Sequence, residues 1–446
     1  MWFGYMGPCL GASWGSGWAL RAGEEGMVWT TLEHPEHSSL PAFALARPLR
    51  RSSLAPRLCP VPCASCPGLS PQPAPRRTPF LPGVALRPPT KPQQAMEGDL
   101  TLQLRIFDLN CCGVIGSGLC VFSRFPILDT LLYQYSLNGY PYMLQHGDWF
   151  CGKSVGLVVI KISGIVFNVY VTHLHAEYCR EKDAYLPHRL VQAWELAQFI
   201  RHTSKAADVV LLGGDLNMHP EDVGIRLLRG WTGLRDAFAE ATRFEGCEDG
   251  CTLIPNNCFT VKTELLPFPL GIRIDYILYK AISSFTVKCE ELKTTTGTAP
   301  GMDIPFSDHE AVMATLHIRR QGQAAGATLG TAEAMLADVV TEARTEVGVG
   351  LRAAQRQRYS TGRMAVLALL LLLLQAAAAL GALAGLAAGQ PFPKLSFSLL
   401  AFLAIGVLLL ATGLHLFHTI EVKMLQGTEE QMRMALRALQ ERPSDG

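Results

Sequence analysis

Short polar clusters rich in Asp, Asn and His follow runs of strand-forming residues at several points of this chain. The clusters are Leu109-Asn110-Cys111, Thr172-His173-Leu174-His175, Gly214-Asp215-Leu216-Asn217, Arg273-Ile274-Asp275-Tyr276 and Ser307-Asp308-His309. Carboxylate and amide oxygens bind hard cations, and a histidine held by a carboxylate can act as a base at neutral pH. Together the clusters predict a metal-dependent phosphoesterase site.

Asp215 and Asn217 end an apolar strand and alternate along it, so they are expected to share one face. Asp215 offers charge to a metal or to an attacking water, and Asn217 offers an amide to a phosphoryl oxygen. Taken alone, the same residues also fit an Asx turn that caps the following helix.

A carboxylate–histidine pair is predicted between Asp275 and His309, since Asp275 could hold the imidazole proton on one nitrogen and leave the other as a general base. His173 and His175 follow one strand, and His173, directly after it, is the favoured donor to phosphoryl oxygens. Both histidines also fit core positions, and an Asp-His pair such as Asp308-His309 is common on surfaces.

The elements that must position these residues read as an α/β pattern from Leu100 to about Ile318. Alternating or continuously apolar stretches predict strands at Leu102–Leu109, Ser154–Ile162, Ile165–Val171 and Ala311–Ile318, and residues 186–203 have the period of an amphipathic helix. Many strands with few helices between them predict two sheets packed face to face and flanked by helices.

Residues 1–95 are rich in Pro, Arg, Ser and Gly and lack a sustained period, so this extension is expected to be disordered. The folded domain is expected to span residues 96–318. A net charge of +1 provides no global field to recruit nucleic acid.

Beyond the folded domain, residues 319–363 are expected to form a linker and an amphipathic helix, and residues 419–446 a tail. Between them, residues 364–418 contain two apolar runs, each long enough to cross a hydrocarbon core of about 30 Å. Arg352, Arg356 and Arg363 precede the runs, which places both flanks in the cytosol by the positive-inside rule. The prediction is a multi-pass membrane protein with a cytosolic catalytic domain.

An aromatic segment, Tyr133–Phe150, lies between predicted strands and is followed by Lys153. Its aromatic side chains fit ordinary hairpin packing. They equally fit a rim that holds a choline head group or enters lipid, with Lys153 at the substrate.

In order and sequence, the polar clusters resemble the endonuclease/exonuclease/phosphatase superfamily. Within it, the chain from Leu100 onward is similar to the mammalian-type neutral sphingomyelinases. The motifs that carry this closer resemblance are Leu137-Asn138-Gly139-Tyr140-Pro141-Tyr142, His146-Gly147-Asp148-Trp149-Phe150, Thr172-His173-Leu174-His175-Ala176-Glu177-Tyr178 and Ser307-Asp308-His309-Glu310-Ala311, together with the membrane hairpin.

The resemblance implies a four-layered α/β/β/α sandwich and Mg²⁺-dependent cleavage of sphingomyelin, or another choline phospholipid, on an endomembrane such as the endoplasmic reticulum. It implies Asn110, Asp215 and Asp308 at the metal and His309 as the base with Asp275 as its partner. It also implies His173 at the phosphate, with Asn217 in substrate recognition.

One part of the family pattern is missing. The family places a helix, a strand with a metal-binding Glu and a further helix where Gly113 joins Val114 directly. Glu177 is the nearest spare carboxylate. Without the Glu, metal binding is expected to weaken and activity to be impaired.

Two other functions stay open. A nuclease of the same fold would need a basic groove, which the near-neutral charge disfavours. A catalytically silent membrane protein is the other alternative, and the missing Glu favours it.

Overall fold

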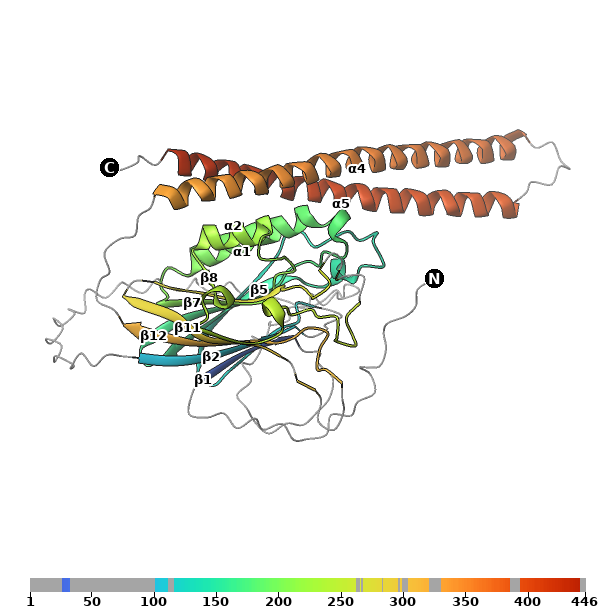
Figure 1. Cartoon of the computed structure of the whole chain (residues 1–446). Helices are drawn as coiled ribbons and strands as arrows, with labels where there is room; N and C mark the ends of the chain where they lie inside the picture. The colour runs from blue at the N-terminus through green and yellow to red at the C-terminus, as the bar shows by residue number, and fades with distance from the viewer. Residues whose placement is uncertain are drawn as a thin grey trace, which may run out of the picture. The chain divides into compact units, whose positions relative to one another are not determined.

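The computed structural model describes most of the chain between Thr101 and Glu441, together with one earlier strand. The described residues are 26–32 (backbone only), 101–110, 116–261, 265, 268–282, 284–295, 297–298, 304–320, 330–385 and 394–441. They form two mixed sheets that pack face to face, as the sequence predicts, with helices beside them (Figure 1).

The first sheet is six-stranded, in the order β3 (Leu119–Ser123), β1 (Gly26–Leu32), β2 (Thr101–Leu109), β12 (Val312–Arg320), β11 (Phe285–Thr294) and β9 (Arg243–Gly246). The second is also six-stranded, in the order β4 (Ile127–Gln134), β5 (Ser154–Ile162), β6 (Ile165–His173), β7 (Val209–Asp215), β10 (Asp275–Ala281) and β8 (Arg235–Asp236).

Strand β1 lies within residues 1–95, the extension that is expected to be disordered. It pairs with β2 in parallel and with β3 in antiparallel fashion, so its backbone is hydrogen-bonded on both edges. Its sequence, Gly-Met-Val-Trp-Thr-Thr-Leu, is rich in β-branched and aromatic residues, which favour strands. The composition of the whole extension hides this short stretch. The rest of the extension lies outside the described residues.

The helices are α1 (Leu186–Thr203), α2 (Val223–Thr232), α3 (Ala237–Glu240), α4 (Gly330–Gly385) and α5 (Lys394–Gln440), with 3₁₀ turns at Gly147–Phe150, Arg180–Lys182 and Glu248–Gly250. Helices α1 and α2 bury one face against the second sheet, where Leu196, Ile200 and Ile225 join the core around Tyr170 and Leu212.

The two outer faces of the sandwich differ in the helices that pack on them. Among the described residues, α1 and α2 form the helical layer on the second sheet, and Figure 1 shows no such layer on the first. The helices that the family pattern would place beside β2 and β3 belong to the segment that is missing between Gly113 and Val114. The architecture of two packed mixed sheets with helices, together with two long apolar C-terminal helices, agrees with the predicted fold class.

The C-terminal part is more continuous than the sequence predicts. Instead of an amphipathic helix, a separate membrane span and a tail, α4 runs unbroken through residues 330–385, and α5 continues to Gln440. The helix α4 continues through Arg352, Arg356 and Arg363. Most of the Gly/Ala-rich linker expected at residues 319–330 lies outside the described residues, as do residues 390–393 of the turn expected between the two apolar runs at 390–394.

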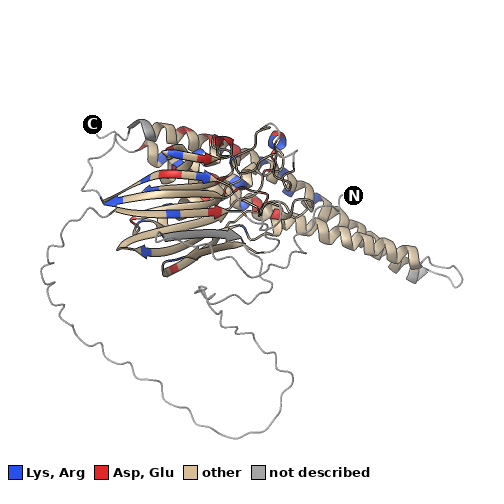
Figure 2. Cartoon of the chain, turned by 60° about the horizontal axis from the view of Figure 1, so that its bottom comes forward, with Lys and Arg blue, Asp and Glu red and all other residues tan. Residues whose placement is uncertain are grey.

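The two long helices pack on each other, and the ends nearest the linker and the C-terminus also pack on α1 and α2. Trp194 and Leu227 lie in one core with Val340, Val422 and Met432. The other ends carry exposed apolar side chains, including Leu367, Leu374, Leu399, Phe402 and Leu410. Apart from Lys394 at the start of α5, these ends contain no acidic or basic residue, and Figure 2 shows them in tan. Both helices are long and apolar enough to cross a membrane.

Candidate active site

The site is built where three neighbouring strands of the second sheet reach the same level. In the ladder register His173, the last residue of β6, lies beside Asp215, the last residue of β7, and Asp275 of β10 lies opposite Asp215. Gly214 permits this approach, because a Cβ there would lie 2.0 Å from the Thr172 carbonyl oxygen and its φ is +146°.

Asp215 is the centre of the cluster. Its Oδ2 lies 2.8 Å from Nδ2 of Asn110, which reaches across from the first sheet, and 3.2 Å from Nε2 of His173. Its Oδ1 accepts a hydrogen bond of 2.8 Å from the Asn217 amide, while the Asn217 side chain donates to Oδ2 at 3.1 Å. The Asx turn and the functional cluster are therefore both present, and the turn does not cap α2.

The charge of Asp215 is set by its neighbours. Burial raises the pKa of this carboxyl, but His173, and then His309 and Lys153, outweigh burial and hold the pKa below its ordinary value. Asp215 is therefore ionised at neutral pH and offers a buried negative charge.

The predicted pairing of Asp275 with His309 is present in the structure. His309 Nδ1 lies 2.7 Å from Asp275 Oδ2, and both side chains are buried. Burial lowers the pKa of His309, but Asp275, followed by Asp215 and Asp308, outweighs it and raises the pKa to about 10. With these carboxylates not neutralised by a cation, His309 is thus protonated at neutral pH. It becomes available as a base only when other positive charge neutralises them.

The arrangement fits a divalent cation. Asp215, Asp275 and His309 each place one ligand atom within 4.8 Å of the others. Asp275 Oδ1 is buried, and no hydrogen-bond donor lies within bonding distance of it in the described part of the chain. Asp308, predicted as a ligand, lies beside the group and accepts a 3.1 Å hydrogen bond from Ser307. Two carboxylates and an amide are the kind of ligands that Mg²⁺ takes.

The two histidines of the Thr172–His175 cluster are separated in role. His173 touches Asp215 and is 21% exposed, whereas His175 is 1% exposed and stacks on Tyr185. Burial lowers the pKa of His175 to about 3, so this ring stays neutral. Of the two histidines, His173 is therefore the one that is partly open to solvent beside Asp215.

Lys153, predicted to bind substrate, is instead turned inward. It is 4% exposed, and its ammonium lies 3.3 Å from Asp148 and 3.2 Å from the Leu174 carbonyl oxygen. The same carbonyl accepts a 2.9 Å hydrogen bond from Asn217. A direct contact with substrate would require Lys153 to leave these partners. In this structure Lys153 instead contacts the site through the Leu174 carbonyl oxygen that Asn217 also binds.

The aromatic segment is partly packed and partly open. Tyr135 is buried, but Tyr142 and Phe150 are exposed, at 42% and 45%. Tyr140 stacks on Tyr142 and contacts Phe417 of α5 through an edge-to-face pair. Hairpin packing and an exposed rim, the two alternatives, thus apply to different residues.

Two carboxylates are candidates to replace the metal-binding Glu that the family pattern implies. Glu177 lies 3.0 Å from Arg180 and 3.8 Å from Arg189, so it is engaged in ion pairs. Asp108, which the sequence motifs do not include, is 3% exposed, and its carboxylate lies against Gly213 on β7. A signal for it exists in the sequence, because Asp108 continues the inward-facing series of Leu104 and Ile106 on β2.

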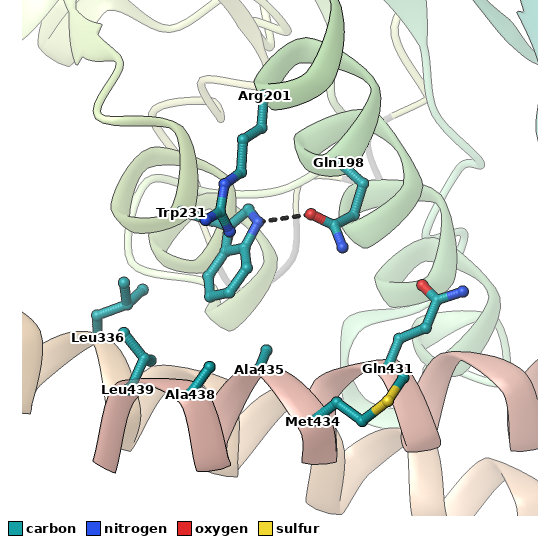
Figure 3. A pocket seen from close by; sticks show the side chains of 9 residues that line it. All are labelled: Gln198, Arg201, Trp231, Leu336, Gln431, Met434, Ala435, Ala438 and Leu439. Atoms are coloured by element: carbon teal, nitrogen blue, oxygen red, sulfur yellow. Dashed lines mark hydrogen bonds between the residues drawn. The ribbon is translucent and has the colours of Figure 1, made fainter. Parts of the chain in front are cut away.

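A separate cavity of about 390 Å³ lies between α1 and α2 on one side and α4 and α5 on the other (Figure 3). It is lined by Trp231, Arg201, Gln198 and apolar residues of the long helices. Trp231 donates a 2.7 Å hydrogen bond to Gln198, and the Arg201 guanidinium stacks over its ring. The lining contains no carboxylate and no histidine, so this cavity is not the hydrolytic site.

Comparisons with known proteins identify the family of the chain. The sequence model of the Endonuclease/Exonuclease/phosphatase family matches residues 74–309. Sphingomyelin phosphodiesterase 2 of Mus musculus is 53% identical over 323 residues, which cover 72% of this chain and 75% of the mouse protein. The Homo sapiens protein of the same name is 51% identical over 327 residues, covering 73% of this chain and 75% of its own length.

Among solved structures, sphingomyelinase C from Streptomyces griseocarneus aligns with 45% of this chain and 68% of its own chain, at 19% identity and a TM-score of 0.34. The matches in sequence are the informative ones, since they cover most of this chain and most of each relative. The chain belongs to the endonuclease/exonuclease/phosphatase family and, within it, is a homologue of sphingomyelin phosphodiesterase 2, a hydrolase of phosphodiester bonds.

Proposed function

We propose that this chain is a Mg²⁺-dependent phosphodiesterase of the phospholipase C type that cleaves sphingomyelin to ceramide and phosphocholine. The observation that carries the proposal is the convergence of Asp215, Asp275 and His309 within 4.8 Å at the ends of β7 and β10. The name of the mouse and human relatives supports sphingomyelin, or another choline phospholipid, as the substrate.

Asp215 and Asn110 would hold the cation, with Asp308 and the unpaired oxygen of Asp275 beside them. When bound, Mg²⁺ supplies positive charge that offsets the negative charge developing on the phosphoryl oxygens. The same positive charge favours the neutral form of His309, which is the form that can accept a proton.

His309, oriented by Asp275, takes a proton from a water molecule that Asp215 also holds. The water oxygen attacks phosphorus, and the bond from phosphorus to the ceramide oxygen breaks on the opposite side. Asn217 and His173 hold the equatorial oxygens. These residues act by positioning and electrostatics, which is how phosphoryl transfer is generally catalysed. Lys153 acts indirectly, by fixing the Leu174 carbonyl that Asn217 binds.

The exposed apolar ends of α4 and α5 support a two-span membrane hairpin, because such a surface is stable in lipid and not in water. The arginines before the hairpin support a cytosolic catalytic domain on the endoplasmic reticulum or another endomembrane. Acidic and basic residues are interspersed on the sheets (Figure 2), which disfavours a nucleic-acid groove.

We also propose that turnover is impaired relative to the mouse and human proteins. Strand β1 lies between β2 and β3, and it contains no acidic residue. The metal-binding Glu implied by the family pattern therefore has no counterpart on this strand, and the cation depends on fewer carboxylates.

The test is phosphocholine release from sphingomyelin micelles by detergent-solubilised protein, with and without Mg²⁺. Release that requires Mg²⁺ and is lost in His309→Ala supports the proposal, while His202→Ala, an exposed histidine on α1, serves as the matched control. If neither the parent protein nor His202→Ala releases phosphocholine and both remain folded, the chain is better described as a catalytically silent membrane protein. Plasmid nicking by the same samples would indicate a nuclease.

A further inference from the structure

A buried polar cluster joins the catalytic domain to the second long helix. It consists of His188 on α1 with His418 and Glu421 on α5, and we call it the clasp. Glu421 Oε1 lies 3.0 Å from His188 Nε2, and Oε2 lies 2.8 Å from His418 Nδ1. All three residues are 2% exposed or less. A buried carboxylate with both oxygens bonded is costly to disrupt, because removing one partner leaves a polar group unsatisfied.

The clasp also reaches the aromatic segment. The backbone N–H of Gly139 donates a 3.0 Å hydrogen bond to Nδ1 of His188. Since Nδ1 accepts, the ring proton sits on Nε2 and is donated to Glu421. The path from α5 to the segment thus runs through the two nitrogens of one imidazole.

Gly139 has no freedom to move inward. A Cβ at this position would lie 2.3 Å from Nε2 of His175. Gln192 holds the neighbouring backbone, since its amide donates to the Leu137 carbonyl at 2.8 Å and its oxygen accepts from the His175 amide at 2.8 Å. The start of the aromatic segment is therefore pinned between α1 and the Thr172–His175 cluster.

The segment is in turn bonded to the active site. The Asp148 carboxylate accepts a 2.8 Å hydrogen bond from the Ala176 amide and pairs with Lys153. Lys153 bonds the Leu174 carbonyl, the partner of Asn217. A continuous set of contacts therefore leads from Glu421 to Asn217 and Asp215.

Tyr140 and Tyr142 of the aromatic segment contact α5 at the point where its apolar part ends. Tyr140 contacts Phe417, and the ring centroids of Tyr142 and His418 are 5.8 Å apart. Phe417 ends the uncharged run of α5, and Glu421 is the first acidic residue after it. The clasp thus fixes the exposed face of Tyr142 at the level where the helix leaves its apolar part.

We infer that the clasp holds the active-site rim at the surface of the bilayer that the chain's own hairpin crosses, so that the enzyme cleaves lipid in that bilayer. His188 and Glu421 are then positioning residues for membrane substrate. This inference rests on the proposed function and names the surface on which it acts. A role in folding alone would instead affect all substrates equally.

The test compares full-length protein, Glu421→Gln and Glu429→Gln in vesicles. Gln at 421 keeps the shape but can accept from only one histidine, whereas Glu429 forms a partly exposed pair with Arg344 on the same helix hairpin and is the matched control. Three substrates are supplied: sphingomyelin in the protein's own vesicles, sphingomyelin in separate vesicles, and water-soluble para-nitrophenylphosphocholine.

The parent is expected to prefer its own vesicles. Glu421→Gln is expected to slow that reaction about tenfold, the size of effect that small displacements of positioning groups produce, while kcat/KM for the soluble ester changes less than about twofold. Glu429→Gln should match the parent. Equal losses on all substrates, no loss, or equal parent rates on own and separate vesicles would overturn the inference.

Hydrogen exchange gives a readout that does not need activity. In vesicles, amides of residues 137–150 should exchange faster in Glu421→Gln than in the parent, with β7 unchanged. Unchanged exchange in 137–150 overturns the inference whether or not the chain is active. A parent that is inactive on every substrate contradicts the proposed function, and the exchange result then decides on the clasp alone.

Discussion

The two sides of the candidate active site differ in how closely they match the family pattern. On the β7–β10 side, His173, Asp215 and Asp275 are neighbours in the strand register, and the expected contact between Asp275 and His309 is present. On the β2–β3 side, Asn110 still reaches Asp215, but β1 from the N-terminal extension lies where a strand with a metal ligand is implied. The half that orients a base can therefore persist while the half that anchors a cation is altered.

The strongest way to break this comparison is Asp275→Asn. If the β7–β10 side is functional, kcat/KM for phosphocholine release should fall by about 10³-fold, the range for a misoriented general base. Asp338→Asn, an exposed aspartate on α4, is the control and should leave the rate unchanged. A loss of less than about tenfold would mean that the Asp275–His309 pair does not act as the base.

Restoring the other side should sharpen the comparison. Inserting the corresponding segment of the mouse relative between Gly113 and Val114 is expected to tighten Mg²⁺ binding and raise turnover by about 10- to 100-fold, as for other changes at a metal's ligand set. A Mg²⁺ titration of activity measures both effects. Unchanged Mg²⁺ dependence would show that the residues already present suffice for the cation.

The approach of β6 to β7 can be tested through stability. Gly214→Ala should lower the free energy of unfolding by about 3 kcal/mol, because the new Cβ meets the Thr172 carbonyl in a backbone conformation unfavourable to side chains. Gly164→Ala has a φ of +87° but open space around its Cβ, so it should cost only about 1 kcal/mol. The difference between the two unfolding free energies, measured in urea, gives the cost of the steric contact. Equal losses in the two variants would contradict the close approach of Gly214 to the Thr172 carbonyl.

A pH dependence of stability is also expected without Mg²⁺. Because the folded pKa of His309 is raised from 6.5 to about 10, its contribution is fully present below pH 6.5 and is lost as pH rises through about 10. Unfolding free energies across this window should therefore fall in the parent more steeply than in His309→Gln. Parallel curves would argue against a buried ion pair.

The parts predicted well from the sequence are those with short-range signals. Strands β6 and β7 end in His173 and Asp215, and the antiparallel strand β10 begins with Asp275, so the sequence pattern predicts that these polar residues lie at one sheet edge. Asp108 escapes this rule because it lies inside its strand and not at the end, although its inward alternation is visible. Lys153 was assigned to substrate because burial of a lysine by Asp148 depends on a loop whose path is not encoded locally.

Contacts between segments that are far apart in the sequence cannot be predicted from local patterns. Nothing in residues 26–32 indicates which strands they join, and composition over the whole extension pointed to disorder. The continuity of α4 does not follow from composition, because an amphipathic stretch and an apolar run differ in pattern whether or not one helix joins them. The clasp unites residues 233 positions apart, so no local pattern announces it.

The packing of α5 on α1 has a consequence for biosynthesis. The face of α1 that carries Leu190 and Trp194 is covered by α4, through Val340 and Val347, and by α5 beyond Val422, and this part of α5 leaves the ribosome after the apolar runs of both long helices. The sheets and the first turns of α4 can form first, but the α5 side of this cover is missing while the hairpin is being delivered to the membrane. The newly made chain thus depends on timely insertion, or on chaperones, to keep a half-covered domain from aggregating.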